Sequence, residues 1–128
     1  MYPEKTVSQN HFQKGLVLFN SARFFEAHEA LEDVWRAAPR HTRLRRHLQG
    51  LVQLAVAFHH QSTGNQLGAG SVLERALRNL EGAEESLPNL DLKSLYVSLT
   101  PWRERLPGTH PSRQSSSPQA QHILARGR

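Results

Sequence analysis

The segment FFEAHEALEDVWR holds residue types from which metal sites and acid–base sites are built. On a helical wheel, His28 lies in the middle of the apolar face, and Glu32 lies at the border of that face, one turn further along. Side chains four residues apart in a helix have Cβ atoms about 5–6 Å from each other, so these two can share one partner. We therefore expect His28 and Glu32 to point inward and to act together.

A second polar set lies in the apolar segment LQGLVQLAVAFHH, where Gln49, Gln53 and His60 share one flank of a helix. Buried polar groups are costly unless they are paired, so this flank needs a partner. If it faces the earlier helix, His28, Glu32 and His60 supply two imidazoles and one carboxylate, with the two glutamines orienting them. Such a set suits one divalent ion, either zinc, iron or manganese, and leaves coordination positions open for water or a substrate.

The string His28-Glu29-Ala30-Leu31-Glu32 is close to the H-E-x-x-H motif of metallohydrolases, in which the first Glu is the general base. Glu29 is therefore a candidate catalytic base, although the wheel turns it toward solvent and Glu32 replaces the second His of the motif. The alternative is a closed hydrogen-bond network that only holds two helices in register. His59 lies within the apolar arc of its helix, which favours a packed core residue over a metal ligand.

Apolar spacing along the chain is helical almost throughout, and no stretch keeps the two-residue alternation of a strand. The predicted fold is all-α, a compact bundle of four to five helices around a central buried helix. Pro39, Gly64, Asn65 and Pro101 supply stop and cap signals. The predicted helices span residues 8–20, 22–38, 42–62, 66–86 and 91–99.

The 128 residues, 38% of them hydrophobic, are enough for one domain with its own core. We assign the domain to residues 1–106. Residues 107–128 are rich in Pro and Ser and poor in apolar side chains, which predicts a disordered tail. Residues 1–106 hold 13 Lys and Arg and all 11 acidic residues, whereas the tail has three Arg and no acid. The tail is therefore basic, the body is nearly neutral, and we expect no nucleic-acid partner.

Two groups of surface cations have simple structural interpretations. Five arginines surround Pro39, where one helix ends and the next begins, and they are typical of a solvated loop near a helix C-terminus; the alternative is a contact with phosphate or RNA. This cluster comprises Arg36, Arg40, Arg43, Arg45 and Arg46. Five histidines are expected on the surface or in the tail, namely His11, His41, His47, His110 and His122.

Composition excludes several classes of protein. The chain has no cysteine, which rules out disulfides, thiolate nucleophiles and Cys-based zinc sites. No run of residues reaches the length and apolarity of a membrane span, and the start MYPEKTVSQN lacks the build of a signal peptide. We therefore expect a cytoplasmic protein with no membrane partner, whose partner is a small molecule or another protein.

Two blocks of the sequence resemble one protein family. FNSARFFEAHEALEDVWR (19–36) and LQGLVQLAVAFHHQSTGN (48–65), followed by Gly68 and Ala69, are similar in order and spacing to the bacterial and archaeal domain-of-unknown-function family 309. The resemblance covers residues 8–87 and implies a small all-helical bundle, which some family descriptions label a predicted metal-dependent hydrolase. It marks the residues His28, Glu29, Glu32, Trp35, Gln49, Gln53, His60 and Asn65.

The chain departs from the family pattern at two positions. Ala22 stands where the pattern has Gly, which affects a turn before a helix, and His59 stands where an aromatic residue is usual. We assign His28, Glu32 and His60 as expected metal ligands and Glu29 as expected catalytic base. Trp35, expected in the core by its wheel position, joins Gln49, Gln53 and Asn65 as an expected binding residue. Two functions remain open: a metal-dependent hydrolase, or a non-enzymatic binding or interaction module.

Overall fold

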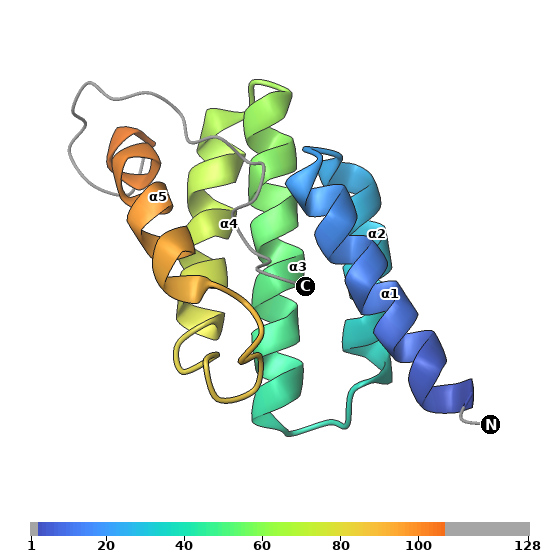
Figure 1. Ribbon diagram of the computed structural model, residues 1–128. Coiled ribbons are helices and arrows are strands. Elements are labelled where there is room, and N and C mark those ends of the chain that lie inside the picture. Colours follow the sequence, from blue (N-terminus) through green and yellow to red (C-terminus); the bar gives the residue numbers. More distant parts are fainter. Residues whose placement is uncertain (1–2, 107–128) are drawn as a thin grey trace.

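The computed structural model describes residues 3–106, with side chains from Asn10 onward, and these residues form five α-helices and no strand. Helix α1 (Pro3–Asn20) packs on α2 (Phe24–Ala37), and α3 (Arg43–Ser62) packs on both α2 and α4 (Gln66–Asn79). Helix α5 (Leu92–Arg105) lies on the α4 side (Figure 1). The expected all-α bundle with a central helix is confirmed. The predicted tail, 107–128, lies outside the described residues.

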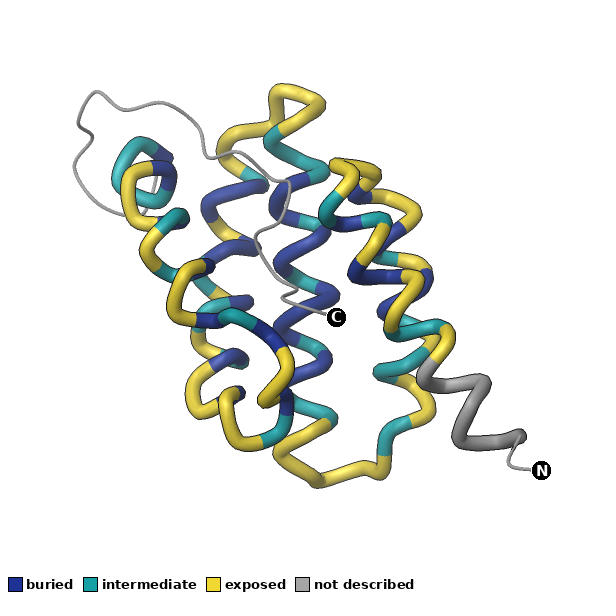
Figure 2. Tube along the Cα trace, in the orientation of Figure 1, coloured by how far each residue is buried: buried dark blue, intermediate teal, exposed yellow. Residues whose placement is uncertain are grey.

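Helix α3 is central because its apolar residues cover most of its circumference. Leu51, Leu54 and Ala55 have no exposed surface, and the middle of the helix is buried on several sides (Figure 2). Four aromatic rings join α1, α2, α3 and α5 at one end of the core. Phe58 stacks on Phe24 at 5.0 Å and on Trp102 at 4.6 Å between ring centroids, and Phe19 meets Phe24 and Phe58 edge-on.

Most helix ends follow the local signals in the sequence. Helix α2 ends before Pro39 because the residue ahead of a proline avoids helical angles, and Ala38 is extended. The Thr42 hydroxyl accepts from the Arg45 N–H at the start of α3. The Asn65 side chain accepts from the Gly68 N–H at the start of α4, and Gly64 before it has φ +88°.

Three helix boundaries differ from those predicted. Helix α1 begins at Pro3 rather than residue 8; a proline is tolerated there because the first helical N–H groups have no intrahelical acceptor. Helix α4 ends at Asn79 rather than near residue 86, and Gly82, with φ +77°, lies in the turns that follow. Helix α5 continues past Leu99 and through Pro101 to Arg105, which brings Trp102 into the core with no exposed surface.

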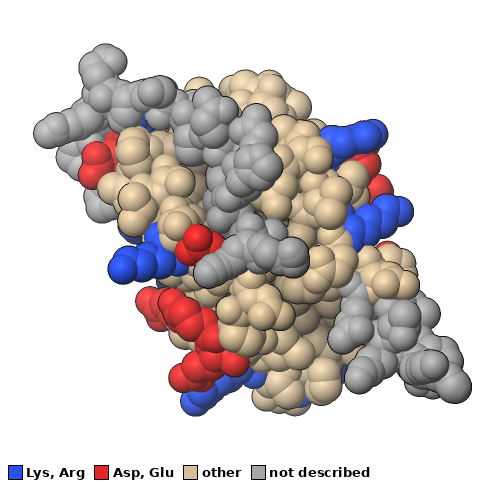
Figure 3. Space-filling model, viewed as in Figure 1, with Lys and Arg blue, Asp and Glu red and all other residues tan. Residues whose placement is uncertain are grey.

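Within the described residues, no helix is long and apolar enough to cross a membrane. On the face shown in Figure 3, Lys and Arg side chains lie apart from one another around the edge and do not form one continuous patch.

Candidate functional site

His28, Glu32 and Arg36 follow one another at four-residue intervals along α2. The His28 Nε2 lies 3.5 Å from Glu32 Oε1, and an Arg36 terminal nitrogen donates to Glu32 Oε2 at 3.1 Å. The His28 and Glu32 side chains are 25% and 26% exposed. Both side chains are thus partly buried at the edge of the apolar face, where Glu32 is also reached by a cation, Arg36, from the solvated side.

His60 and Asn65 connect the end of α3 to the start of α4. The Asn65 amide donates to His60 Nδ1 at 3.4 Å while its carbonyl oxygen caps α4. The neighbouring His59 is half-buried against the ring of Phe25, at 5.5 Å between centroids, and the same ring lies 5.9 Å from that of His28. His28 and His59 thus contact the same aromatic ring, and His59 stands at the position where the family pattern has an aromatic residue.

No three His, Asp or Glu side chains among the described residues are arranged so that they could hold a metal ion. The structure places His28 and Glu32 together but does not bring His60 to them. Glu29, the expected general base, is exposed on α2, as its wheel position predicted. The assignment of these residues to metal binding and catalysis therefore stays a prediction.

The two glutamines of α3 face α4 and the end of α2. Gln53 Oε1 accepts a 2.8 Å hydrogen bond from the Asn79 side chain, a contact that the sequence patterns did not indicate. Gln49 is half-buried, and its amide has no hydrogen-bond partner among the described residues. It lines a pocket of about 520 Å³. This pocket, named here the arginine pocket, is lined by Trp35, His41, Thr42, Arg43, Arg45, Arg46, Gln49 and Asn79.

The arginines of this region make different contacts, so they do not form one loop cluster. Arg45 donates through Nη1 to the carbonyls of Arg36 and Ala38, and its guanidinium lies 5.0 Å from the centre of the Trp35 ring. Arg46 donates through Nη2 to the carbonyls of Arg78 and Glu81. These two side chains therefore hold the C-terminal ends of α2 and α4.

Two other arginines of the sequence cluster are paired with carboxylates. Arg36 pairs with Glu32, and Arg43 lies 2.6 Å from Glu85. Trp35, expected to be a core residue by its wheel position, is half-buried and forms a wall of the arginine pocket.

His47 was expected on the surface and is instead 1% exposed. Its Nε2 lies 2.9 Å from the Glu81 carbonyl, and its Nδ1 lies 2.9 Å from the Ser86 hydroxyl. Because a carbonyl only accepts, Nε2 donates to it, and in the neutral ring Nδ1 then accepts from the Ser86 hydroxyl. The helical wheel did not predict that His47 is buried, because its partners Glu81 and Ser86 belong to the turns after α4, where the sequence predicts a continuing helix.

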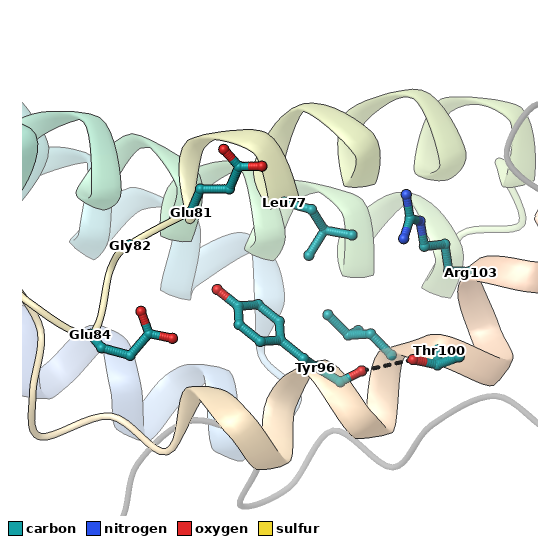
Figure 4. Close-up of a pocket in the computed structure, with 8 residues that line it drawn as sticks. Leu77, Glu81, Gly82, Glu84, Tyr96, Thr100 and Arg103 are labelled. Carbon is teal, nitrogen blue, oxygen red and sulfur yellow. Dashed lines mark hydrogen bonds between the residues drawn. The ribbon is translucent and has the colours of Figure 1, made fainter.

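A second cavity, of about 380 Å³, lies between α4, the turns after it and α5 (Figure 4). The Tyr96 hydroxyl donates to the Leu80 carbonyl at 3.1 Å. Burial raises the pKa of Tyr96, and the negative charges of Glu84 and Glu81 raise it further. At the other end of the cavity, Arg103 forms a two-point contact with Glu74, and this hydrogen bonding raises the pKa of Arg103.

Comparison with known proteins relates part of the chain to one family. Residues 12–72 match the family described as "Domain of unknown function (DUF309)". The chain is 33% identical over 93 residues to "Uncharacterized protein YpuF" of Bacillus subtilis (strain 168), covering 72% of this chain and 49% of that protein.

It is also 27% identical over 81 residues to an "Uncharacterized protein" of Aquifex aeolicus (strain VF5), covering 63% of this chain and 24% of that protein. The chain thus spans half or less of the length of these relatives. No solved structure matches it.

Proposed function

We propose that this chain, which belongs to the DUF309 family through residues 12–72, is a small-ligand-binding module and that the arginine pocket is its binding site. The proposal rests chiefly on Gln49, whose half-buried amide has no partner among the described residues and faces a pocket shared with Trp35. An amide that lines a pocket and has no protein partner keeps its donor and acceptor groups available for a bound ligand. Both residues belong to the two sequence blocks that characterise the family.

The pocket has the size of a ligand site and offers both an aromatic surface and polar groups. Its volume of about 520 Å³ lies within the range of roughly 300–1,000 Å³ that is usual for small-molecule sites. Trp35 supplies an aromatic surface, and the amides of Gln49 and Asn79 can donate and accept hydrogen bonds. Asn79 is oriented by its hydrogen bond with Gln53, so one side of the pocket is prearranged.

Nuclear magnetic resonance on labelled protein can test the proposal, because the described residues contain two tryptophans in different surroundings. Trp35 lines the pocket, while Trp102 has no exposed surface and serves as an internal control. Addition of the small-molecule fraction of a Bacillus subtilis extract should shift the signals of the Trp35 indole and the Gln49 amide and leave Trp102 unchanged.

The variant Gln49→Leu should lose these shifts, whereas Gln66→Leu, a change at an exposed residue at the start of α4, should keep them. Unchanged Trp35 and Gln49 signals in the parent protein would overturn the proposal. Equal shifts in the Gln49→Leu variant would also overturn it.

A metal-dependent hydrolase is the second candidate, and the pairing of His28 with Glu32 at 3.5 Å favours it. These two side chains could supply an imidazole and a carboxylate, and His60 or His59 would have to approach them to complete the set, with Glu29 as base. Elemental analysis should compare the parent protein, purified without a histidine tag or chelator, with the double variant His28→Ala, His60→Ala. Near-stoichiometric metal in the parent and none in the variant would support this candidate; no metal retained by either, even after divalent ions are added, would remove it.

A further inference from the structure

We propose that the ligand of the arginine pocket is a small molecule that carries a phosphate group. This inference rests on the proposed function above and names the chemistry of its ligand. Three of the residues that line the pocket are arginines, and a fourth, His41, adds an imidazole. None of the lining residues is acidic. A concave site whose charged lining residues are all arginines attracts anions.

Two of these positive charges have no counter-ion in the described part of the chain. Arg43 pairs with Glu85, but Arg45 and Arg46 donate only to backbone carbonyls. The carbonyls at the end of a helix carry only a partial negative charge, so they offset the charge of a guanidinium only in part. A doubly charged oxyanion is therefore the ligand whose charge balances Arg45 and Arg46, and phosphate fits this better than a single carboxylate.

The two guanidinium groups also keep donors for a ligand. Arg45 makes its hydrogen bonds of 3.3 and 2.9 Å through Nη1 alone, and Arg46 makes its bonds of 3.5 and 3.2 Å through Nη2 alone. A guanidinium has five N–H groups on three nitrogens, so each side chain retains its Nε and its second terminal nitrogen. The carbonyl contacts and the Trp35 ring hold the groups in place, which lowers the entropy cost of binding.

The position of Gln49 adds a further donor on the same side of α3. It follows Arg45 by four residues and Arg46 by three, and side chains at these spacings are neighbours on a helix. A phosphate has several acceptor oxygens, which the two guanidiniums and the Gln49 amide can share. The remainder of the ligand would contact Trp35 and Asn79, since the pocket is larger than an isolated phosphate requires.

A small phosphorylated molecule fits these observations better than a nucleic acid. Proteins that follow a phosphate backbone neutralise several phosphates along a groove. Here Arg36 and Arg43 are already paired with Glu32 and Glu85, and of the arginines that line the pocket, Arg45 and Arg46 are the two without a paired carboxylate.

The test is a titration of isotope-labelled full-length protein with inorganic phosphate and pyrophosphate, with sodium acetate at matched ionic strength as the reference anion. Phosphate and pyrophosphate should shift the Trp35 indole, the Gln49 amide and the Arg45 and Arg46 Nε signals in a saturable way, and acetate should not. Gln49→Glu places a negative charge in the pocket without breaking a protein contact, and it should weaken phosphate binding about tenfold or more. Gln66→Glu changes the net charge equally at an exposed site and should leave the affinity within about twofold of the parent.

The outcomes separate this inference from the proposed function. If phosphate and pyrophosphate leave the pocket signals unchanged while the small-molecule extract shifts them, the phosphate inference is wrong and the binding function stands. If neither shifts them, both fail. Equal shifts with acetate, or equal weakening by the two glutamate variants, would also overturn the inference. Tighter binding of a short single-stranded RNA, with a steep loss of affinity in salt, would replace the small molecule by a nucleic acid.

Discussion

The carboxylate of Glu32 lies between two groups on its own helix, His28 on the preceding turn and Arg36 on the following one. The wheel predicted the pairing with His28 correctly, because that spacing follows from helix geometry alone. It did not predict that the pair would be accessible to Arg36. This partial exposure decides how much the pair stabilises the fold, because a partly exposed ion pair contributes much less than a buried one.

The variant Glu32→Ala should therefore lower the free energy of unfolding by no more than about 1 kcal/mol, since partly exposed ion pairs four residues apart on a helix are weak. Urea denaturation of parent and variant at neutral pH measures this. Glu26→Ala, which removes a more exposed pair with Arg23 at 3.4 Å, is the matched control and should change stability even less. A loss above about 2 kcal/mol for Glu32→Ala would mean that the carboxylate is buried in solution.

His47 has the opposite character, because both of its ring nitrogens are used inside the protein. His47→Ala should cost about 2–4 kcal/mol, since it removes a buried ring and leaves the Glu81 carbonyl and the Ser86 hydroxyl without this partner. Ser86→Ala removes only one of the two hydrogen bonds and should cost about 1 kcal/mol. Equal stability of the parent and the His47→Ala variant in thermal and urea denaturation would contradict the buried position of this side chain.

At the scale of elements, the turn between α1 and α2 carries the departure from the family pattern noted in the sequence. Ala22 has φ +64°, a left-handed conformation that glycine adopts without strain and alanine does not. The N–H of Arg23 bonds to the Leu18 carbonyl at 2.9 Å across this turn, so its shape is held by the chain around it. This left-handed conformation explains why the family pattern has Gly at this position.

Ala22→Gly should raise the free energy of unfolding by about 0.5–1 kcal/mol, because it relieves this strain. Ala37→Gly, at the exposed last residue of α2, is the control and should not stabilise the protein, because α2 has ordinary helical geometry at its end. Melting temperatures of the two variants provide the comparison, and a lower value for Ala22→Gly than for the parent would show that the turn has a different conformation in solution.

Tyr96 helps to attach helix α5 to α4 and to the turn that follows α4. Because this side chain can titrate, its contribution to the stability of the protein depends on pH. Its pKa is raised in the folded protein, so above the ordinary tyrosine pKa near 10 the native state holds more protons than the unfolded state. Stability from this group is full below that pH and falls as pH rises through the folded pKa. Urea denaturation from pH 8 to 11 should therefore show that the stability advantage of the parent over Tyr96→Phe shrinks above pH 10; a constant difference would contradict the raised pKa.

At the scale of the whole molecule, two glycines set how closely the helices approach. A Cβ on Gly50 of α3 would lie 2.7 Å from the Leu80 Cγ and 3.1 Å from the Ala76 carbonyl, and one on Gly15 of α1 would lie 2.7 Å from the Leu31 Cγ. The first contact joins α3 to the end of α4, and the second joins α1 to α2. The close approach of α3 to α4 and of α1 to α2, which are seen in Figure 1, thus requires glycine at these two positions.

Gly50→Ala should lower stability by about 1–3 kcal/mol through overpacking, although alanine favours a helix by about 1 kcal/mol over glycine. Leu80→Ala opens the same space, so the cost of Gly50→Ala should be much smaller in that background. Denaturation of the four proteins of this double-mutant cycle gives the coupling. Independent, additive effects would show that the two helices do not meet at this glycine.

The sequence by itself determined the all-α class, the position of α2 and α3 within two residues, and the cap at Asn65. These follow from helical periodicity and from the local chemistry of Pro39 and Gly64, which act within a few residues. Only the tertiary structure decided what lies across from each polar side chain. It paired Gln53 with Asn79, buried His47 and left His60 apart from His28 and Glu32. A wheel assigns a side chain to one face of its own helix, whereas its partners depend on how other helices pack against that face.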